Sequence, residues 1–187
     1  MNITFKALHE SDFPLLLKWL EAPHVKKYWP ADRSFSVGGD QDVEWTLELI
    51  EEKYSSYARG YKLVDGTEKP IRAYIICADE HPIGYIQLYN AHDFPRSTKL
   101  TDSPEELGAF DIFIGEKECL GTGLGSAAIT KFMQTYADNY THIFVDPDID
   151  NIAAIKSYEK AGFQRMSEQK DSNEVWMIWE KDSANEK

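Results

Sequence analysis

Apolar and polar residues follow two periods along this chain, and the two periods separate strands from helices. Strict alternation over 3–8 predicts a strand, because every second side chain of a strand faces the same side. Helical spacing of apolar residues follows Ser11 and Asp12, which can cap a helix, and Ala22-Pro23 ends it. The same spacing predicts two more helices, over 24–29 and 43–57, with a loop over 33–40 between them.

The rest of the chain is typical of a sheet with crossover helices. Strands are predicted over 72–78 and 83–89, joined into a hairpin by a turn over 79–82, and a polar loop is predicted over 92–106. The order that follows is strand 109–114, helix 125–138, strand 142–145, helix 151–161 ended by Gly162, and closing strands from 163 onward and over 174–179. This order predicts an α/β fold of three layers, with a mostly antiparallel sheet between helices.

Length, charge and cysteine content narrow the class of protein. A chain of 187 residues forms one domain with a sizeable core but is short for two, so we expect a single domain over 1–187. The net charge of -12 repels nucleic acid and anionic membranes and attracts cations. Cys77 and Cys119 lack metal-type spacing, as do His24, His81, His92 and His142, so neither a disulfide nor a metal is expected. With a polar start and no apolar run of about 20 residues, we expect a soluble cytoplasmic protein; monomer or homodimer stays open.

Three glycines at alternate positions stand between a predicted strand and a predicted helix, in Leu120-Gly-Thr-Gly-Leu-Gly-Ser126. A helix start presents unpaired N–H groups and a positive dipole end, and glycines let those groups approach an anion. The run is no P-loop, because no Lys-Ser/Thr follows Gly125, and it lacks the dinucleotide fingerprint. A phosphate or pyrophosphate site and a plain tight turn are about equally supported by this run alone.

A second motif, DNIAAIKSYEKAGF over 150–163, follows the next predicted strand. Asn151 and Tyr158 are seven residues apart, so a helix places them on one face, two turns apart. Taken singly, the two residues are a helix cap and a core tyrosine.

Together the two motifs resemble the signature of the GNAT family of acetyl-CoA-dependent N-acetyltransferases. Within it, F-x-x-L-x-x-W-L, H-V-x-x-Y-W and P-I-G-Y-x-Q-x-Y make the chain look closest to aminoglycoside 6'-N-acetyltransferases. The resemblance implies a splayed mixed sheet and a donor-binding core over about 107–166. It implies that acetyl-CoA contacts Ile112, Phe113, Ile114, Leu120, Gly121, Thr122, Gly123, Leu124, Gly125, Ser126, Asn151, Ala154 and Tyr158. One departure is Leu120, where the family usually has Arg or Gln.

Two residues are candidates for catalysis. Asp111 lies in the middle of the apolar strand A-F-D-I-F-I, where a carboxylate is costly, and we expect it to take the proton of the acceptor ammonium. Tyr158, which the resemblance points at the thioester sulfur, is expected to protonate the leaving thiolate. The resemblance places Trp29, Tyr54, Gln87, Tyr89 and Asp146 around the acceptor, next to Asp111. The predicted loop over 92–106 adds Asp93, Asp102, Glu105 and Glu106, but it differs from the family's loop in length and composition. Trp19 and Trp45 are expected in the core.

These residues and the net charge favour a cationic small-molecule amine as acceptor, above all the 6'-amine of an aminoglycoside. The same chemistry on a siderophore hydroxylamine or on a protein N-terminus is the alternative within the family. A non-catalytic acyl-CoA-binding module is the third hypothesis, and it gives no reason for Asp111 and Tyr158 to be present.

Overall fold

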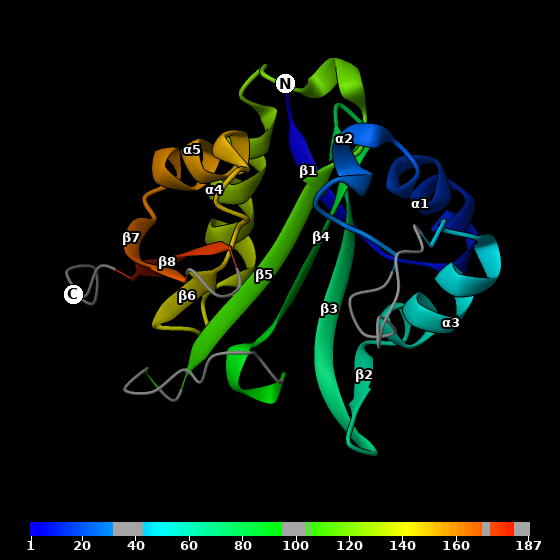
Figure 1. Cartoon of the computed structure of the whole chain (residues 1–187), viewed down its shortest axis with the longest axis horizontal. Coiled ribbons are helices and arrows are strands. Elements are labelled where there is room, and N and C mark those ends of the chain that lie inside the picture. Colours follow the sequence, from blue (N-terminus) through cyan, green and yellow to red (C-terminus); the bar gives the residue numbers. More distant parts are fainter. Residues whose placement is uncertain (32–42, 95–103, 105, 170–172, 182–187) are drawn as a thin grey trace.

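A twisted sheet divides the molecule, with one group of helices on each of its faces (Figure 1). The computed structural model describes residues 1–31, 43–94, 104, 106–169 and 173–181. Its strands are β1 (Ile3–Ala7), β2 (Tyr61–Val64), β3 (Thr67–Ala78), β4 (His81–Asn90), β5 (Leu107–Ile114), β6 (His142–Val145), β7 (Gln164–Gln169) and β8 (Glu174–Glu180). Its helices are α1 (Phe13–Leu20), α2 (Pro23–Lys26), α3 (Leu47–Ala58), α4 (Leu124–Tyr136) and α5 (Ile152–Lys160). The predicted three-layer α/β fold is confirmed.

The sheet opens at its centre, between β5 and β6. Its strand order is β1-β3-β4-β5-β6-β8-β7, with β2 paired to β3, and β5 with β6 is the parallel pair among antiparallel ones. β4 pairs with β5 from Gly108 to Ile114, whereas β6 pairs with β5 only from Leu107 to Ala109. The carboxyl half of β5 therefore has no strand of the described residues on its second side, which makes the sheet splayed.

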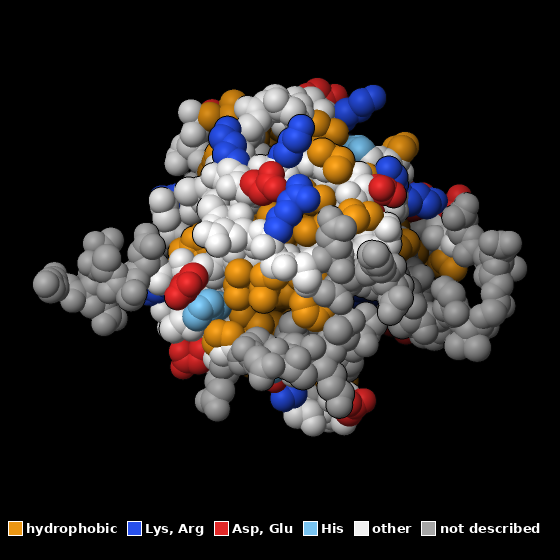
Figure 2. Space-filling model, turned by 60° about the vertical axis from the view of Figure 1, so that its left-hand side comes forward, with side chains coloured by type: hydrophobic (Ala, Val, Ile, Leu, Met, Phe, Trp, Pro, Cys, Tyr) orange, Lys and Arg blue, Asp and Glu red, His pale blue; other side chains and the backbone are white. Residues whose placement is uncertain are grey.

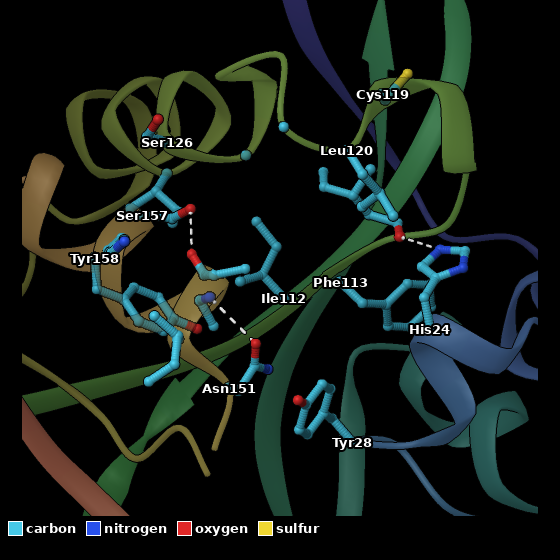
Figure 3. A pocket seen from close by; sticks show the side chains of 18 of the residues that line it. His24, Tyr28, Ile112, Phe113, Cys119, Leu120, Ser126, Asn151, Ser157 and Tyr158 are labelled. Atoms are coloured by element: carbon cyan, nitrogen blue, oxygen red, sulfur yellow. Dashed lines mark hydrogen bonds between the residues drawn. The ribbon is translucent and has the colours of Figure 1, made fainter. Parts of the chain in front are cut away.

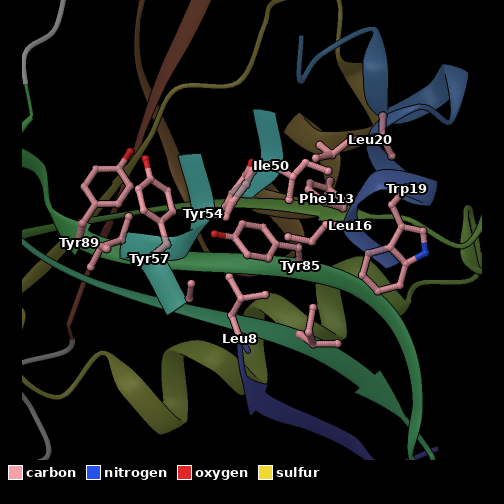
Figure 4. Packing of buried hydrophobic residues seen from close by; sticks show 14 of the residues in the cluster. Leu8, Leu16, Trp19, Leu20, Ile50, Tyr54, Tyr57, Tyr85, Tyr89 and Phe113 are labelled. Atoms are coloured by element: carbon pink, nitrogen blue, oxygen red, sulfur yellow. The ribbon is translucent and has the colours of Figure 1, made fainter. Parts of the chain in front are cut away.

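Two clusters of buried side chains hold the layers together. One lies between the sheet and α1–α3 and includes Trp19, Tyr54, Tyr85 and Phe113 (Figure 4). The other lies between the sheet and α4 and α5. Trp19 and Trp45 are buried, as predicted from the sequence.

The end of β5 is anchored to α1, and this contact fixes where the glycine run begins. A side chain at Gly115 would collide with the ring of Trp19, so the close approach of strand and helix requires glycine there. Glu116 accepts hydrogen bonds from Lys18 Nζ at 2.6 Å and from Trp19 Nε1 at 2.8 Å. The Lys18 and Trp19 hydrogen bonds lower the pKa of the Glu116 carboxyl, because they favour its charged form.

The largest differences from the predicted element boundaries are at the starts of β3 and α3. The strand predicted over 72–78 begins at Thr67 and forms a hairpin with β2, which was not predicted. Asp65 and Gly66, at φ 49 and 76, make its two-residue turn, for which Asp-Gly is well suited. The helix predicted from residue 43 begins at Leu47, because the side chain of Thr46 accepts a hydrogen bond from the Leu49 N–H and caps it. The predicted loop over 33–40 and most of the loop over 92–106 lie outside the described residues.

Candidate active site

A cavity of about 740 Å³ lies beside the open half of β5. Its walls come from α2, the end of β5, the glycine run, the start of α4 and the face of α5 (Figure 3). Most sequence-predicted donor residues line it: Ile112, Phe113, Ile114, Leu120, Gly121, Gly123, Gly125, Ser126, Asn151, Ala154 and Tyr158. Thr122 and Leu124 lie in the same turn but do not line the cavity. Segments far apart in sequence thus meet around one ligand-sized space.

The glycine run forms the left-handed turn from which α4 starts. Gly121 and Gly123 have φ of 71 and 86, a region that side chains with a Cβ rarely adopt. Ala127 donates the first helical hydrogen bond, to the Gly123 carbonyl, so the N–H groups of 124–126 precede the hydrogen-bond ladder. Gly123 provides no side-chain cap for them. These N–H groups and the helix dipole make the turn suited to an anion.

The exposed edge of β5 offers peptide groups to the cavity. Gly115 donates its N–H to the Ile83 carbonyl at 2.8 Å, and peptide groups alternate in direction along an antiparallel pair. Phe113 and Asp111 therefore direct their peptide groups at β4, whereas Ile112 and Ile114 direct theirs away from it, into the gap between β5 and β6. The Ile114 carbonyl accepts a hydrogen bond at 3.1 Å from Nε2 of His24 on α2 (Figure 3).

Asn151 and Tyr158 both face the cavity from α5, as their spacing predicts (Figure 3). Asn151 Oδ1 caps α5 by accepting a hydrogen bond from the Ala154 N–H at 3.2 Å. Tyr158 is buried, with its ring 5.8 Å from Phe110 and 5.5 Å from Phe163, centroid to centroid. Burial raises the pKa of the Tyr158 hydroxyl, and the carboxylates of Asp111 and Asp146 raise it further, so the group stays protonated.

Asp111 lies on the other face of β5, at the end of a chain of hydrogen bonds. The Tyr85 hydroxyl donates to Gln87 Oε1 at 2.8 Å, and Gln87 Nε2 donates to Asp111 Oδ2 at 2.7 Å. Gln87 is 8% exposed and Tyr85 is 0% exposed, whereas Asp111 is half-buried. Both ends of the Gln87 amide are therefore engaged within the protein, and its nitrogen holds the carboxylate in place.

The other residues expected around the acceptor differ from one another in burial and in contacts. Tyr54 is 0% exposed and its hydroxyl accepts a hydrogen bond from Trp29 Nε1 at 3.0 Å, while Trp29 also lines the cavity beside β5. Tyr89 is buried against Phe94, with ring centroids 4.6 Å apart. Asp146 directly follows β6 and is half-buried.

The acidic loop is only partly described. Asp93 forms an ion pair with Lys69 at 2.9 Å, and Glu106 is exposed. Asp102 and Glu105, which we expected near the acceptor, lie outside the described residues.

Several residues that line the cavity were not predicted from the sequence as site residues. His24 and Tyr28 come from the α2 region, and the Tyr28 hydroxyl donates to the Asp150 carbonyl at 3.3 Å across the cavity. Lys156 and Lys160 line the cavity from α5, and both lie within the motif that was recognised. Only their charge and their i, i+4 spacing could have pointed to them.

Two kinds of feature are absent from the described residues. No three His, Cys, Asp or Glu side chains among them are grouped so as to hold a metal ion. None of the helices in the described part of the chain combines the length and apolar character needed to cross a bilayer.

The sequence matches the family model for the acetyltransferase (GNAT) domain over residues 9–170. The chain therefore belongs to the GNAT family, and it is an acetyltransferase. It is 25% identical over 166 residues to the aminoglycoside N(6')-acetyltransferase type 1 of Klebsiella pneumoniae, covering 88% of this chain and 75% of that relative. The protein of the same name from Serratia marcescens matches with the same figures.

Solved structures show the same fold. AAC(6')-Ib in complex with ribostamycin and coenzyme A has a TM-score of 0.75 at 25% identity, over 97% of this chain and 94% of that one. An uncharacterized protein from Bacillus halodurans also has a TM-score of 0.75, at 20% identity, over 95% of this chain and 83% of that one. The second likeness concerns the fold alone.

Proposed function

We propose that this acetyltransferase transfers the acetyl group of acetyl-CoA to a primary amine of a cationic small molecule, specifically the 6'-amine of an aminoglycoside. The observation that carries this proposal is the Asp111 carboxylate. It lies on β5, the strand whose open edge borders the cavity, and Gln87 of β4 holds it in place. Similarity to aminoglycoside N(6')-acetyltransferases over 88% of the chain supports the choice of acceptor.

The donor cavity fits acetyl-CoA in shape and charge. Left-handed glycines and the start of α4 suit its pyrophosphate. The Ile112 carbonyl and the Ile114 N–H, which both point into the gap, suit an extended pantetheine arm that pairs like an added strand. The bound donor supplies a thioester that an amine can attack, with the coenzyme A thiolate as the leaving group. Its pantetheine arm would lie between β5 and α5, where Asn151 and Ala154 line the wall.

Asp111 prepares the acceptor in this proposal. An amine at neutral pH carries a proton and has no lone pair for attack, so a nearby carboxylate must first take that proton. Asp111 accepts the ammonium, and the hydrogen bond from Gln87 to Oδ2 leaves Oδ1 for the substrate. Asp111 takes this proton directly or through water, which frees the lone pair for attack. The nitrogen becomes positively charged as the C–N bond forms, and it loses its second proton to the solution as the tetrahedral intermediate collapses to the amide.

Two further groups of the chain complete the transfer. The Ile112 N–H, which points into the gap, is placed to donate to the thioester oxygen as negative charge develops there. The Tyr158 hydroxyl stays protonated in its buried setting and gives its proton to the departing sulfur as the C–S bond breaks. Tyr158 then regains a proton from the solution.

One observation favours the hydroxylamine alternative. Lys62 on β2 is half-buried, with Nζ 5.3 Å from the centroid of the Phe94 ring. Burial lowers the pKa of the Lys62 ammonium, while the charge of Asp111 raises it, so a cation interacts with the proposed base. That cation repels a polycationic acceptor and attracts an acceptor that also carries a carboxylate, such as a hydroxylated amino acid.

The test is a thiol-release assay with acetyl-CoA and four acceptors: kanamycin A, spermidine, N6-hydroxylysine and a short peptide. Selective turnover of kanamycin A supports the proposal. Turnover of N6-hydroxylysine or of the peptide alone would keep the acetyltransferase and replace the acceptor. Thiol release that is no faster with any acceptor than without one, although coenzyme A binds, would contradict catalysis on these amine classes.

A further inference from the structure

The donor site has a cradle for phosphate but no cation within the glycine run. Leu120, at the start of the run, brings no charge, and the residue is 43% exposed. The Thr122 hydroxyl donates to the Cys119 carbonyl at 2.7 Å, and the Ser126 hydroxyl donates to the Gly123 carbonyl at 3.1 Å. Both hydroxyl protons are therefore used locally, which leaves backbone N–H groups as the run's own donors.

The absence of a cation in the glycine run affects ligand binding because the protein as a whole is negatively charged. The protein has 32 Asp and Glu against 20 Lys and Arg, and coenzyme A carries several negative charges at neutral pH. Backbone dipoles alone must then attract a polyanion to an acidic protein. A side-chain cation near the turn would offset the long-range repulsion.

Helix α5 brings such a cation to the turn. Lys160 Nζ lies 3.8 Å from the point that a Cβ on Gly123 would occupy, and Lys160 lines the same cavity as Gly121 and Gly123. Lys156, one turn earlier on α5, lines this cavity as well. Figure 2, which turns the α5 side of the molecule forward, shows Lys and Arg side chains on the upper half of this face, with Asp and Glu side chains between them.

Lys160 is not neutralised by its neighbour. The adjacent carboxylate, Glu159, accepts a hydrogen bond from Arg165 Nε at 2.8 Å and pairs with that residue instead. Within the described residues, no carboxylate forms an ion pair with Lys160. An exposed ammonium that no carboxylate of the described residues pairs with, beside a turn rich in N–H donors, is available for a phosphate oxygen.

We propose that Lys160 is the phosphate-binding side chain of the donor site, supplying from α5 the cation that the glycine run lacks. Its ammonium binds a pyrophosphate oxygen while the N–H groups at the start of α4 bind the others. This assignment rests on the proposed function, because it requires acetyl-CoA to occupy the cavity.

The test compares coenzyme A binding to the wild type, Lys160→Ala, Lys160→Arg and Lys131→Ala by calorimetry. Lys131 is exposed on α4, does not line the cavity and provides the same change in charge. Loss of one charge-assisted contact predicts a Kd about 10-fold higher for Lys160→Ala. Lys160→Arg should recover most of the affinity, and Lys131→Ala should bind like the wild type. The thermal midpoints of all four proteins should agree, because Lys160 is exposed.

A second donor separates phosphate binding from other roles of Lys160. S-acetylpantetheine keeps the thioester and the arm but lacks the pyrophosphate. Turnover with saturating acceptor should therefore have the same kcat/KM for this donor in the wild type and in Lys160→Ala, while kcat/KM for acetyl-CoA falls about 10-fold.

The possible failures are distinguishable. Wild-type protein that does not bind coenzyme A would overturn the proposed function together with this inference. Wild-type binding that is matched by Lys160→Ala would overturn the role of Lys160 alone. An equal loss with S-acetylpantetheine and acetyl-CoA would show that Lys160 does not act on the phosphates.

Discussion

Gln87 and Asp111 face each other directly across the β4–β5 pair, and the Gln87 amide donates a 2.7 Å hydrogen bond to the Asp111 carboxylate. Gln87 in turn accepts from Tyr85, which belongs to the buried cluster under α1–α3. The proposed base is thus positioned by the core rather than by a surface loop. We infer that Gln87, which resemblance suggested as an acceptor contact, acts by orienting Asp111.

This relationship predicts the outcome of a double-mutant cycle. Asp111→Asn should lower kcat by about 100-fold or more, because it removes a general base, while the Kd of coenzyme A stays unchanged. Gln87→Leu should lower kcat by about 10-fold, because the general base is still present but is no longer held in place. In the double variant the effect of Gln87→Leu should vanish, since there is no carboxylate left to orient.

Steady-state kinetics and calorimetry on the four proteins measure this cycle. Additive losses in the double variant would show that Gln87 acts independently of Asp111. An Asp111→Asn variant with full turnover would remove Asp111 from the mechanism.

Tyr158→Phe should lower kcat by about 100-fold and leave the fold intact, because only the hydroxyl that protonates the thiolate is lost. Tyr136→Phe is the matched control, since Tyr136 lies on α4 in an aromatic cluster with Phe5, Phe132 and Tyr74, outside the cavity. Thiol release at saturating substrates, with circular dichroism of both variants, provides the comparison. Equal rates for the wild type and Tyr158→Phe would assign Tyr158 to core packing.

Lys62→Gln should lower the KM for an aminoglycoside by about threefold, because it removes a cation that interacts with Asp111. For N6-hydroxylysine, whose carboxylate Lys62 would attract, the KM should rise. Lys131→Gln, with the same charge change on α4, should alter neither value. A KM that moves in the same direction for both acceptors would show that Lys62 acts through packing on Phe94 and not through charge.

The buried tyrosines predict a loss of stability at alkaline pH. Burial raises the pKa values of the Tyr54, Tyr57, Tyr85 and Tyr158 hydroxyls above about 10, their value in the unfolded chain. The folded state therefore keeps protons that the unfolded state loses. The stability contribution is complete below about pH 10 and decreases as the pH rises above it.

Urea unfolding at several pH values measures this decrease, and Tyr57→Phe should show a smaller decrease than the wild type above about pH 10. Absorbance at 295 nm should show the four tyrosines ionising only as the protein unfolds. Reversible ionisation of all ten tyrosines near pH 10, with the circular dichroism unchanged, would contradict the prediction.

The elements that the sequence predicts well are those whose signal is local. The glycine run and the α5 motif each combine spacing, capping and turn chemistry within a few residues, and the structure brings both to one cavity. The hairpin of β2 and β3 was missed although Asp65-Gly66 is a strong turn signal, because Glu68, Lys69 and Pro70 are poor strand formers. An edge position tolerates them.

The features that could not be predicted depend on contacts between distant segments. His24 reaches Ile114 across 90 residues, and Lys160 reaches Gly123 from another helix. Tyr54 is buried by side chains from other parts of the chain, and both ends of the Gln87 amide are hydrogen-bonded within the sheet. The pattern of apolar and polar residues contains no signal for either feature. Resemblance placed these residues near the acceptor but gave no indication of which ones support the others.

The most direct test of the account is acetylation of neomycin and paromomycin, which differ in carrying an amine or a hydroxyl at the 6' carbon. Each would be incubated with the protein and acetyl-CoA, and the masses of the products would be measured by mass spectrometry. The account predicts one added acetyl group on neomycin and none on paromomycin. Equal acetylation of both would contradict transfer to the 6'-amine, and acetylation of neither, with coenzyme A bound, would contradict an aminoglycoside acceptor.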